Sequence, residues 1–536
     1  MHGLMMDTQL TLTPLFERAA RLFPYREIAS KTPDGMFRYR YADFHARVHR
    51  LAHVLRGLGI RPGDRVGTLC WNSHRHLELY FAVPCAGAVL HALNLRLAED
   101  QLAYTVNHAA DCVVFADASL MPMLRKLEGR IPSVERVIVL PDQPWDGGED
   151  DYESLLAAAP AAAFPWPALD ERSAFATCYT SGTTGNPKAV WYTHRGMYLH
   201  TMAVSMADTF GMCERDVLLQ IVPMFHANGW GFPYAAIANG AKIVLGGRAV
   251  QPDVVAELIE TERATFTHGV PTIWMQLWQY LQDHPRDLSS LRCVLVAGSA
   301  MPRGLIEKFE SRYGLEFRLG WGMSETSPMA TVNTFKSNMD GLEGAAKIDR
   351  RARHGLPLPG IELRILGDDG AEVPADGATM GELQVRGPWV TSGYYMDPRP
   401  ADQAAAESFQ DGWFRTGDVA TVDADGYIQI MDRTKDLVKS GGEWISSVDL
   451  ENAIMAHPKV AEAAVIAVPH PKWQERPLAC VVVKPGEELA KEELLGFLSG
   501  RVAKWWLPDE IAFIDAVPKT SVGKFNKRAL RQRFVG

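Results

Sequence analysis

The chain has 536 residues and a formal net charge of −9, with 47% hydrophobic and 22% charged residues. This length exceeds that of one ordinary hydrophobic core, so we expect two or more domains. The lack of a basic surplus argues against a nucleic-acid-binding protein. Seven scattered cysteines without C-x-x-C spacing argue against a zinc site and a disulfide framework, and favour reduced thiols in a cytoplasmic protein.

Two further exclusions concern targeting and membranes. The N-terminus has no basic region followed by an apolar stretch, so no signal peptide is predicted. The longest apolar stretch, 79–93, is shorter than the roughly 20 residues that span a bilayer, and Pro84 interrupts it. Any membrane contact is therefore expected to be peripheral.

In the first two thirds of the chain, segments with helical spacing alternate with short apolar runs. Helices are expected at 41–58, 74–90, 98–108 and 119–129, and strands at 65–71, 112–116, 136–140, 241–245, 264–269 and 293–297. Strands separated by helices indicate a largely parallel sheet covered on both faces.

From about residue 355 the pattern changes to alternating apolar and polar residues, which is typical of half-buried antiparallel strands. The last hundred residues predict helices at 448–456 and 490–504 and strands at 461–468, 478–483 and 510–514. We therefore expect an α/β fold. Its large N-terminal domain, 1–432, combines mostly parallel sheets flanked by helices with a β-rich subdomain at about 355–431, and a small α+β domain follows at 433–536.

Residues 179–188, Tyr-Thr-Ser-Gly-Thr-Thr-Gly-Asn-Pro-Lys, are the most informative segment. Glycines let backbone N–H groups approach phosphate oxygens, hydroxyls can ligate Mg²⁺, and the lysine supplies a compact positive charge. The expected phosphate-binding residues are Thr180, Ser181, Gly182, Thr183, Thr184, Gly185 and Lys188. Because Asn186 and Pro187 precede the lysine, this is not a Walker A loop. The alternative is a hydroxyl-rich surface turn.

This decapeptide resembles the phosphate loop of the adenylate-forming superfamily, which contains acyl-CoA synthetases, adenylation domains and luciferases. Six later segments follow in the family's order: Gly320–Thr326, Tyr394–Tyr395, Trp413–Asp418, Asp432–Lys435, Gly441–Trp444 and Pro518–Lys524. The resemblance therefore covers nearly the whole chain.

For the nucleotide, the resemblance implies that Thr180 and Glu325 are the magnesium ligands. Trp321 stands where the family more often has Tyr, and either stacks on adenine or is a structural aromatic residue. Asp418 is implied to accept hydrogen bonds from the ribose hydroxyls, and Arg433 is implied to join it at the ribose. The remaining residues implied at the nucleotide are Gly298, Ser299, Ala300, Gly320, Gly322 and Ser324.

For catalysis, the resemblance implies that Lys524 contacts both the carboxylate and the α-phosphate during adenylation. The alternative is one more cation in the basic tail. Lys435 marks the hinge about which a mobile C-terminal domain swings between the two half-reactions. Lys439 and Trp444 resemble residues that contact the adenylate in long-chain acyl-CoA synthetases.

For the acid, the segment 223–233 is expected to line the acyl pocket. His226 either orients the carboxylate or is a satisfied core histidine, and Trp230 resembles a gate to an acyl tunnel. The predicted substrate-binding set is His226, Ala227, Trp230, Gly298 and Gly322. No acidic residue lies between Gln220 and Gly240, which disfavours an amino-acid substrate.

The resemblance thus implies an ATP-dependent carboxylate–CoA ligase of the AMP-forming type, with Mg²⁺, ATP and coenzyme A, acting on a medium- or long-chain fatty acid. The alternatives are a ligase for a short, branched, aromatic or thioether acid such as methylmercaptopropionate, an adenylating enzyme that is luciferase-like or loads a carrier protein, or a non-catalytic nucleotide- or acyl-binding protein. Similar long-chain enzymes suggest a homodimer.

Overall fold

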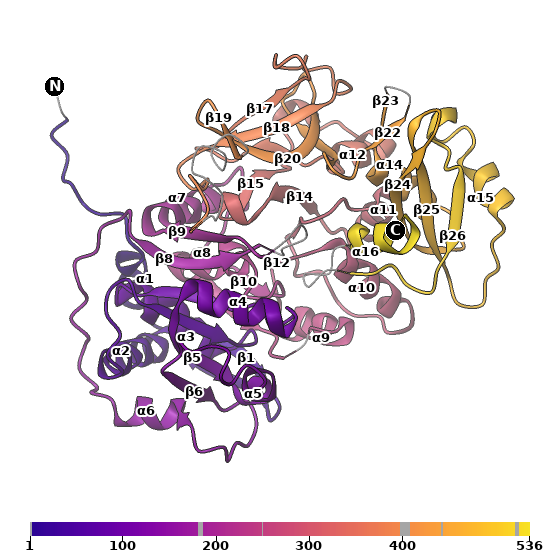
Figure 1. The fold of residues 1–536 in the computed structure, drawn as a ribbon. Helices are drawn as coiled ribbons and strands as arrows, with labels where there is room; N and C mark the ends of the chain where they lie inside the picture. The colour runs from indigo at the N-terminus through magenta and orange to yellow at the C-terminus, as the bar shows by residue number, and fades with distance from the viewer. Residues whose placement is uncertain are drawn as a thin grey trace.

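The computed structural model describes residues 3–180, 186–248, 250–396, 408–440, 443–519 and 525–535. Within these residues the strands form four sheets. Figure 1 shows two helix-flanked sheets in the N-terminal half, the β-rich subdomain (orange) and the small C-terminal domain (yellow). The predicted α/β class, with a β-rich subdomain and an α+β C-terminal part, is confirmed.

Two large sheets form the N-terminal part. One has the order β16-β15-β14-β13-β12-β10-β11-β1-β2 and the other β7-β6-β5-β3-β4-β8-β9. The neighbours from β1 through β11, β10, β12 and β13 to β14 pair in parallel, whereas the edge strands pair antiparallel. Their bounds are β1 Glu27–Thr32, β2 Gly35–Arg40, β3 Arg65–Leu69, β4 Val89–Ala92, β5 Asp111–Asp117, β6 Arg136–Leu140, β7 Asp150–Asp151, β8 Ala174–Tyr179, β9 Ala189–Thr193, β10 Val217–Gln220, β11 Lys242–Leu245, β12 Phe266–Gly269, β13 Cys293–Val296, β14 Phe317–Gly322, β15 Met329–Val332 and β16 Leu356–Pro357.

Helices cover these sheets and bury their apolar sides. They are α1 Leu12–Leu22, α2 Tyr41–Gly57, α3 His74–Cys85, α4 Glu99–Ala109, α5 Met121–Arg125, α6 Tyr152–Ala158, α7 His194–Ser205, α8 Phe232–Asn239, α9 Pro252–Glu262, α10 Pro271–Asp283, α11 Arg303–Tyr313 and α12 Gly344–Arg351. No helix of the described residues is long and apolar enough to cross a membrane.

The third and fourth sheets divide the C-terminal part. The β-rich sheet has the order β17-β18-β20-β19 with β21 on β20, and the last sheet has the order β23-β22-β25-β24 with β26 on β25. The bounds are β17 Glu362–Leu366, β18 Gly381–Arg386, β19 Phe409–Gln410, β20 Trp413–Val422, β21 Ile428–Arg433, β22 Val438–Ser440, β23 Glu443–Ile445, β24 Val460–His470, β25 Gln474–Val483 and β26 Glu510–Phe513. The helices of the small domain are α14 Ser447–Met455, α15 Lys491–Leu498 and α16 Lys527–Phe534.

Three helix predictions were wrong in extent. The helix expected at 74–90 ends at Cys85, because Val89–Ala92 is fully buried and pairs with β3 and β8 as strand β4. The helix expected at 119–129 shortens to α5, and that expected at 490–504 shortens to α15. Tertiary pairing overrode helical spacing at β4, where the strand is buried on both faces.

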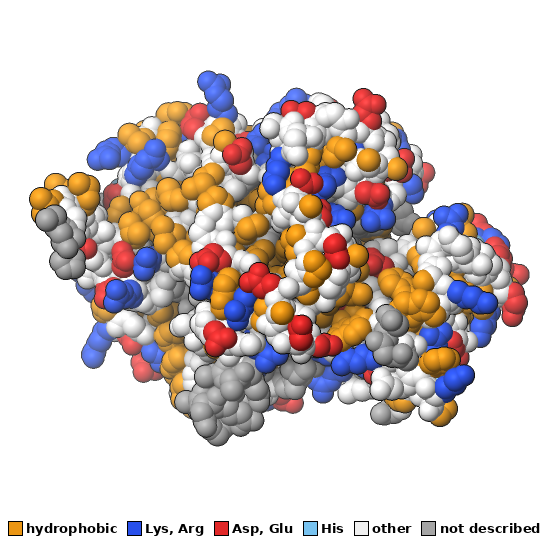
Figure 2. All heavy atoms as spheres, turned by 90° about the horizontal axis from the view of Figure 1, so that it is seen from above, with side chains coloured by type: hydrophobic (Ala, Val, Ile, Leu, Met, Phe, Trp, Pro, Cys, Tyr) orange, Lys and Arg blue, Asp and Glu red, His pale blue; other side chains and the backbone are white. Residues whose placement is uncertain are grey.

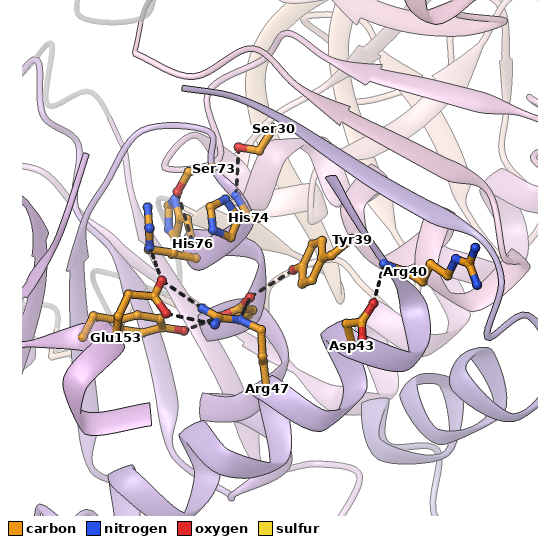
Figure 3. A network of polar contacts seen from close by, with 12 residues as sticks. Ser30, Tyr39, Arg40, Asp43, Arg47, Ser73, His74, His76 and Glu153 are labelled. Atoms are coloured by element: carbon orange, nitrogen blue, oxygen red, sulfur yellow. Dashed lines mark hydrogen bonds and ion pairs between the residues drawn. The ribbon is translucent and has the colours of Figure 1, made fainter. Parts of the chain in front are cut away.

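A buried ion network ties α2, α3 and α6 together. Glu78 is 0% exposed and accepts hydrogen bonds from Tyr39, Tyr152 and Arg47. Arg47 also contacts Glu153 at 2.9 Å, which Figure 3 shows with Tyr39 on the other side of the guanidinium. A buried carboxylate needs such partners, because an unpaired charge in a low-dielectric interior is costly.

The surface mixes charges of both signs. On the face in Figure 2, Lys and Arg side chains are interspersed with Asp and Glu, and neither sign gathers into one large area.

Candidate active site

Three of the predicted nucleotide residues, Trp321, Asp418 and Arg433, contact one another through Asp418. The Trp321 indole N–H donates to Asp418 Oδ2 at 2.8 Å, and Arg433 Nε lies 2.7 Å from Asp418 Oδ1. Trp321 comes from β14, and Asp418 and Arg433 are paired on β20 and β21. The Asp418 carboxylate is thereby oriented, and each of its oxygens can accept a second hydrogen bond from a ligand.

Glycine is required beside Trp321. A Cβ on Gly322 would lie 1.9 Å from the carbonyl oxygen of Pro328, and one on Gly320 would lie 2.8 Å from that of Thr331. The backbone of β14 can therefore approach β15 closely only because both residues lack side chains. This close approach fixes the turn into Ser324 and Glu325.

The predicted magnesium ligand Glu325 is buried and held by Tyr394. The Tyr394 hydroxyl donates to Glu325 Oε1 at 2.7 Å, and the Thr391 N–H donates to the Glu325 carbonyl. Lys188 Nζ lies 4.6 Å from the centre of the Tyr394 ring, within cation–π range. Tyr394 thus connects the lysine that ends the phosphate loop to the acid of the Gly320–Thr326 motif.

The two ends of the phosphate loop hydrogen-bond to each other. The Thr180 N–H donates to the Lys188 carbonyl at 2.9 Å, and the Lys188 N–H donates to Thr180 Oγ1 at 3.1 Å. The loop residues between them that were predicted to bind phosphate, 181–185, lie outside the described residues.

The segment predicted to flank adenine follows β13 at the carboxyl end of the parallel sheet, which is the ligand-binding edge of such sheets. Gly298 has a φ of 91°, which favours glycine, and Ser299 is exposed. Ala300 is half-buried. Gly298, Ser299 and Ala300 are therefore placed at the expected edge.

At the predicted acyl pocket the backbone takes an unusual path. Five consecutive residues, Ala227 to Gly231, have φ between 43° and 75°. For residues other than glycine this region is sparsely populated, and such strain is often retained at functional sites. The run turns Trp230 inward, where it is buried and stacks on His268 with ring centres 5.4 Å apart.

Behind Trp230, Gln220 fixes the state of His268. The Gln220 amide N–H group donates to the carbonyls of Val222 and Gly229, at 2.8 and 3.3 Å. Its oxygen is then left to accept from His268 Nε2 at 3.0 Å, and burial lowers the pKa of His268 to about 3. His268 is therefore a neutral ring that backs the tryptophan.

His226 lies at the entry to this turn and is half-buried. Its N–H donates to the Pro223 carbonyl, and its carbonyl accepts from the Gly229 N–H, both at 3.0 Å. These two bonds fix the backbone of His226 at the start of the turn.

The predicted residues of the small domain fall into two groups. Lys439 and Trp444 face each other across β22 and β23, with Nζ 4.9 Å from the ring centre. Lys435 follows β21, and its carbonyl accepts from Arg531 at 3.2 Å. The predicted catalytic lysine, Lys524, lies outside the described residues.

Two residues that contact the predicted site, Tyr394 and Tyr192, were not predicted as site residues from the sequence. Tyr394 was noticed only as part of a motif, although its hydroxyl contacts Glu325. Tyr192 donates to the Ser324 carbonyl at 2.9 Å, and burial raises its pKa well above the ordinary value, so the hydroxyl stays protonated. The Tyr394–Tyr395 pair was the only signal for the first, and the sequence carried none for the second.

The chain belongs to the AMP-binding enzyme family, whose model matches residues 16–395, and the C-terminal domain of AMP-binding enzymes matches residues 449–524. The membership expected from the motifs is confirmed.

Two relatives and one solved structure show what the chain is similar to. It is 48% identical over 532 residues to a long-chain-fatty-acid–CoA ligase of Thermus thermophilus, covering 99% of this chain and 96% of the relative. It is 43% identical over 540 residues to a 3-methylmercaptopropionyl-CoA ligase of Ruegeria lacuscaerulensis, covering 100% and 99%. An anthranilate CoA ligase in complex with anthranoyl-AMP superposes with a TM-score of 0.87 at 25% identity, covering 99% and 98%.

Proposed function

We propose that this chain, an AMP-forming acid–CoA ligase of the AMP-binding enzyme family, activates a medium- or long-chain fatty acid with ATP and transfers the acyl group to coenzyme A. The observation that carries the site assignment is the connection of Lys188, Tyr394 and Glu325 beside the oriented Asp418 carboxylate. The Lys188 ammonium, the two carboxylates and the Tyr394 hydroxyl together offer the positive charge, metal ligands and hydrogen-bonding groups that a nucleotide and its phosphates need.

The residues present fit a magnesium ion. Thr180 Oγ1 and the Glu325 carboxylate would hold Mg²⁺, which would offset phosphate charge when bound, since hard cations prefer oxygen ligands. Glu325 is buried and gives one oxygen to Tyr394, which leaves the other oxygen available to a ligand. Lys188 would contact the terminal phosphates as a point charge.

The reaction has two steps. In the first, a carboxylate oxygen forms a bond to the α-phosphorus, and the bond between that phosphorus and the pyrophosphate oxygen breaks. Lys524 is proposed to stabilise the charge of this transition state, with the ribose held by Asp418 and Arg433. In the second, the thiolate of coenzyme A attacks the acyl carbonyl and AMP leaves with the carboxyl oxygen. Lys435 is proposed as the hinge between the two arrangements.

For the acid we propose a pocket bounded by His226, Ala227, Trp230, Gly298 and Gly322. Buried aromatic rings at Trp230 and Phe232 suit a hydrocarbon chain. The likeness to the Thermus long-chain ligase supports a fatty acid. The likeness to a 3-methylmercaptopropionyl-CoA ligase makes a short thioether acid the second candidate.

Pyrophosphate release across acids from acetate to palmitate, with aryl and thioether acids included, tests this function. Each acid is assayed with and without coenzyme A. We expect the highest kcat/KM for a medium- or long-chain fatty acid, with thioester formed only when coenzyme A is present. A higher value for methylmercaptopropionate would establish the second candidate. Release of no pyrophosphate with any acid would establish the non-catalytic alternative.

Two finer points complete the proposal. We propose a homodimer, by resemblance to long-chain enzymes, and multi-angle light scattering tests it, with the monomer mass as the contrary result. We also propose a cytoplasmic location, which the seven free cysteines support and cell fractionation tests.

A further inference from the structure

A buried polar cluster joins the end of the large domain to the small domain beside the proposed hinge. Its four residues are Asp432, Ser447, Glu451 and Lys527. Asp432 is on β21 of the β-rich sheet, whereas the other three belong to α14 and α16. Asp432, Ser447 and Glu451 are 3%, 0% and 6% exposed, so the cluster is shielded from water. Figure 1 shows α14 and α16 at the inner side of the small domain.

Ser447 is the link across the domain boundary. Its N–H donates to Asp432 Oδ2 at 2.8 Å, and its hydroxyl donates to the same oxygen. The preceding Ser446 hydroxyl donates to the Met431 carbonyl at 2.7 Å. The start of α14 is therefore held by β21 through both backbone and side chain, and the carboxylate lies at the favourable N-terminal end of the helix.

Lys527 connects the same cluster to α16. Its ammonium donates to the Ser447 hydroxyl and lies 2.7 Å from Glu451 Oε1, which also accepts the Val465 N–H at 2.7 Å. Further along α16, Arg531 contacts Asp436. The first turn of α16 is thus connected through Ser447 to Asp432 before the hinge, and its second turn contacts Asp436 just after it.

The cluster lies close in sequence to the predicted catalytic lysine, which links it to catalysis. Lys527 follows the predicted catalytic Lys524 by three residues. Contacts that hold the start of α16 therefore act close in sequence to the predicted catalytic lysine. The contacts of Ser447 with Asp432 join two domains, so they can exist only in some arrangements of those domains.

We propose that Lys527 is a positioning residue: through Ser447 and Asp432 it holds the small domain against the end of β21, in a set of contacts that we call the latch, and so favours the domain arrangement in which adenylation occurs. The inference rests on the proposed two-step function. Burial of a lysine between two carboxylates costs desolvation, which is offset only while all partners are in place. The latch therefore favours one domain arrangement and is released as a unit.

The test separates the two half-reactions in the full-length enzyme. Ser447→Ala removes the bridging hydroxyl but keeps the backbone N–H, and Lys527→Met removes the charge at similar length. We expect each to lower kcat/KM for adenylation by about tenfold and to change thioester formation from supplied acyl-AMP by less than about twofold. Lys459→Met is the matched control, because it breaks a pair with Glu493 that lies wholly inside the small domain and outside the Pro518–Lys524 segment.

Equal loss of both half-reactions, or no loss of either in Ser447→Ala, would overturn the latch. Lys527→Met can fail through instability, so Ser447→Ala and its urea midpoint decide that case. A wild-type enzyme that releases no pyrophosphate refutes the proposed function instead. Small-angle scattering then still tests the latch: Ser447→Ala should change the profile, and a profile identical to the wild type counts against it.

Discussion

The phenolic oxygen of Tyr394 lies 2.7 Å from Glu325 Oε1, and the ring of the same tyrosine lies under the Lys188 ammonium. One side chain therefore sets the position of the proposed metal ligand and of the lysine that ends the phosphate loop. A hydrogen bond to a charged acceptor contributes about 1.5–3 kcal/mol.

Tyr394→Phe tests this relationship, because it keeps the ring and removes only the hydroxyl. We expect the KM for MgATP to rise by about fivefold or more, since a less ordered Glu325 binds the metal–nucleotide complex more weakly. Titration calorimetry with a non-hydrolysable ATP analogue should show the same loss in Mg²⁺ and a smaller loss without it.

Tyr395→Phe is the matched control for that variant. The Tyr395 ring stacks on Trp191 and its N–H donates to the Ala189 carbonyl, so loss of the hydroxyl leaves both contacts in place. Equal changes in the two variants would contradict a specific role for Tyr394.

The hydrogen bond from the Trp321 indole to Asp418 leads to a second prediction. Trp321→Phe keeps an aromatic face at the proposed adenine site but leaves Asp418 Oδ2 without its indole donor at 2.8 Å. We expect ATP to bind about three- to tenfold more weakly by calorimetry, because the carboxylate proposed to hold the ribose loses the donor that orients it. Trp413→Phe, on the same strand as Asp418 and stacked on Arg386, should bind ATP as the wild type does.

The sequence predicted the architecture of the fold better than it predicted the contacts within the site. Alternating helices and strands predicted the layered α/β architecture because period and burial are local properties of a segment. The same reasoning extended a helix to residue 90, into strand β4, and overlooked β1, since pairing with β3, β8 and β11 is decided by distant residues.

Within the site, motif residues could be named but their partners could not. The sequence pointed to Trp321, Asp418 and Arg433 separately, whereas their mutual bonds arise from pairing of β20 with β21 and packing on β14. Neither Tyr192 nor His268 carries a local signal, because a buried donor or a backing ring looks like any other core residue. The positive φ values of Ala227–Gly231 are likewise a property of tertiary packing.

Buried neutral histidines predict loss of stability in acid. His76 is 0% exposed, and burial lowers its pKa from 6.5 to about 4. Its stabilising contribution is complete above pH 6.5, where both folded and unfolded forms are neutral, and is lost as the pH falls toward 4. The full loss is about 3 kcal/mol.

Urea denaturation at steps between pH 7 and pH 4 measures this dependence. His76→Gln should be less stable than the wild type at pH 7 but should lose less stability on acidification. His284→Gln, at an exposed histidine whose ring centre lies 4.6 Å from that of Tyr280, is the control and should keep the wild-type slope. A wild-type slope in His76→Gln would contradict the assignment.

The final prediction concerns the buried network of α2, α3 and α6. Arg47 Nε lies 2.7 Å from Glu78, whose side chain is 0% exposed, so Arg47→Met leaves an uncompensated charge in the core. Breaking such a pair costs about 3–5 kcal/mol of unfolding free energy.

Arg130→Met is the control: it breaks the exposed pair with Asp100 and should cost at most about 1 kcal/mol. Thermal unfolding of both variants provides the comparison, and equal shifts would mean that Glu78 relaxes toward water. The double variant Arg47→Met, Glu78→Gln should regain part of the loss, because it removes the unpaired charge, keeps an oxygen acceptor for one of the hydroxyls of Tyr39 and Tyr152, and offers the other an amide N–H to accept.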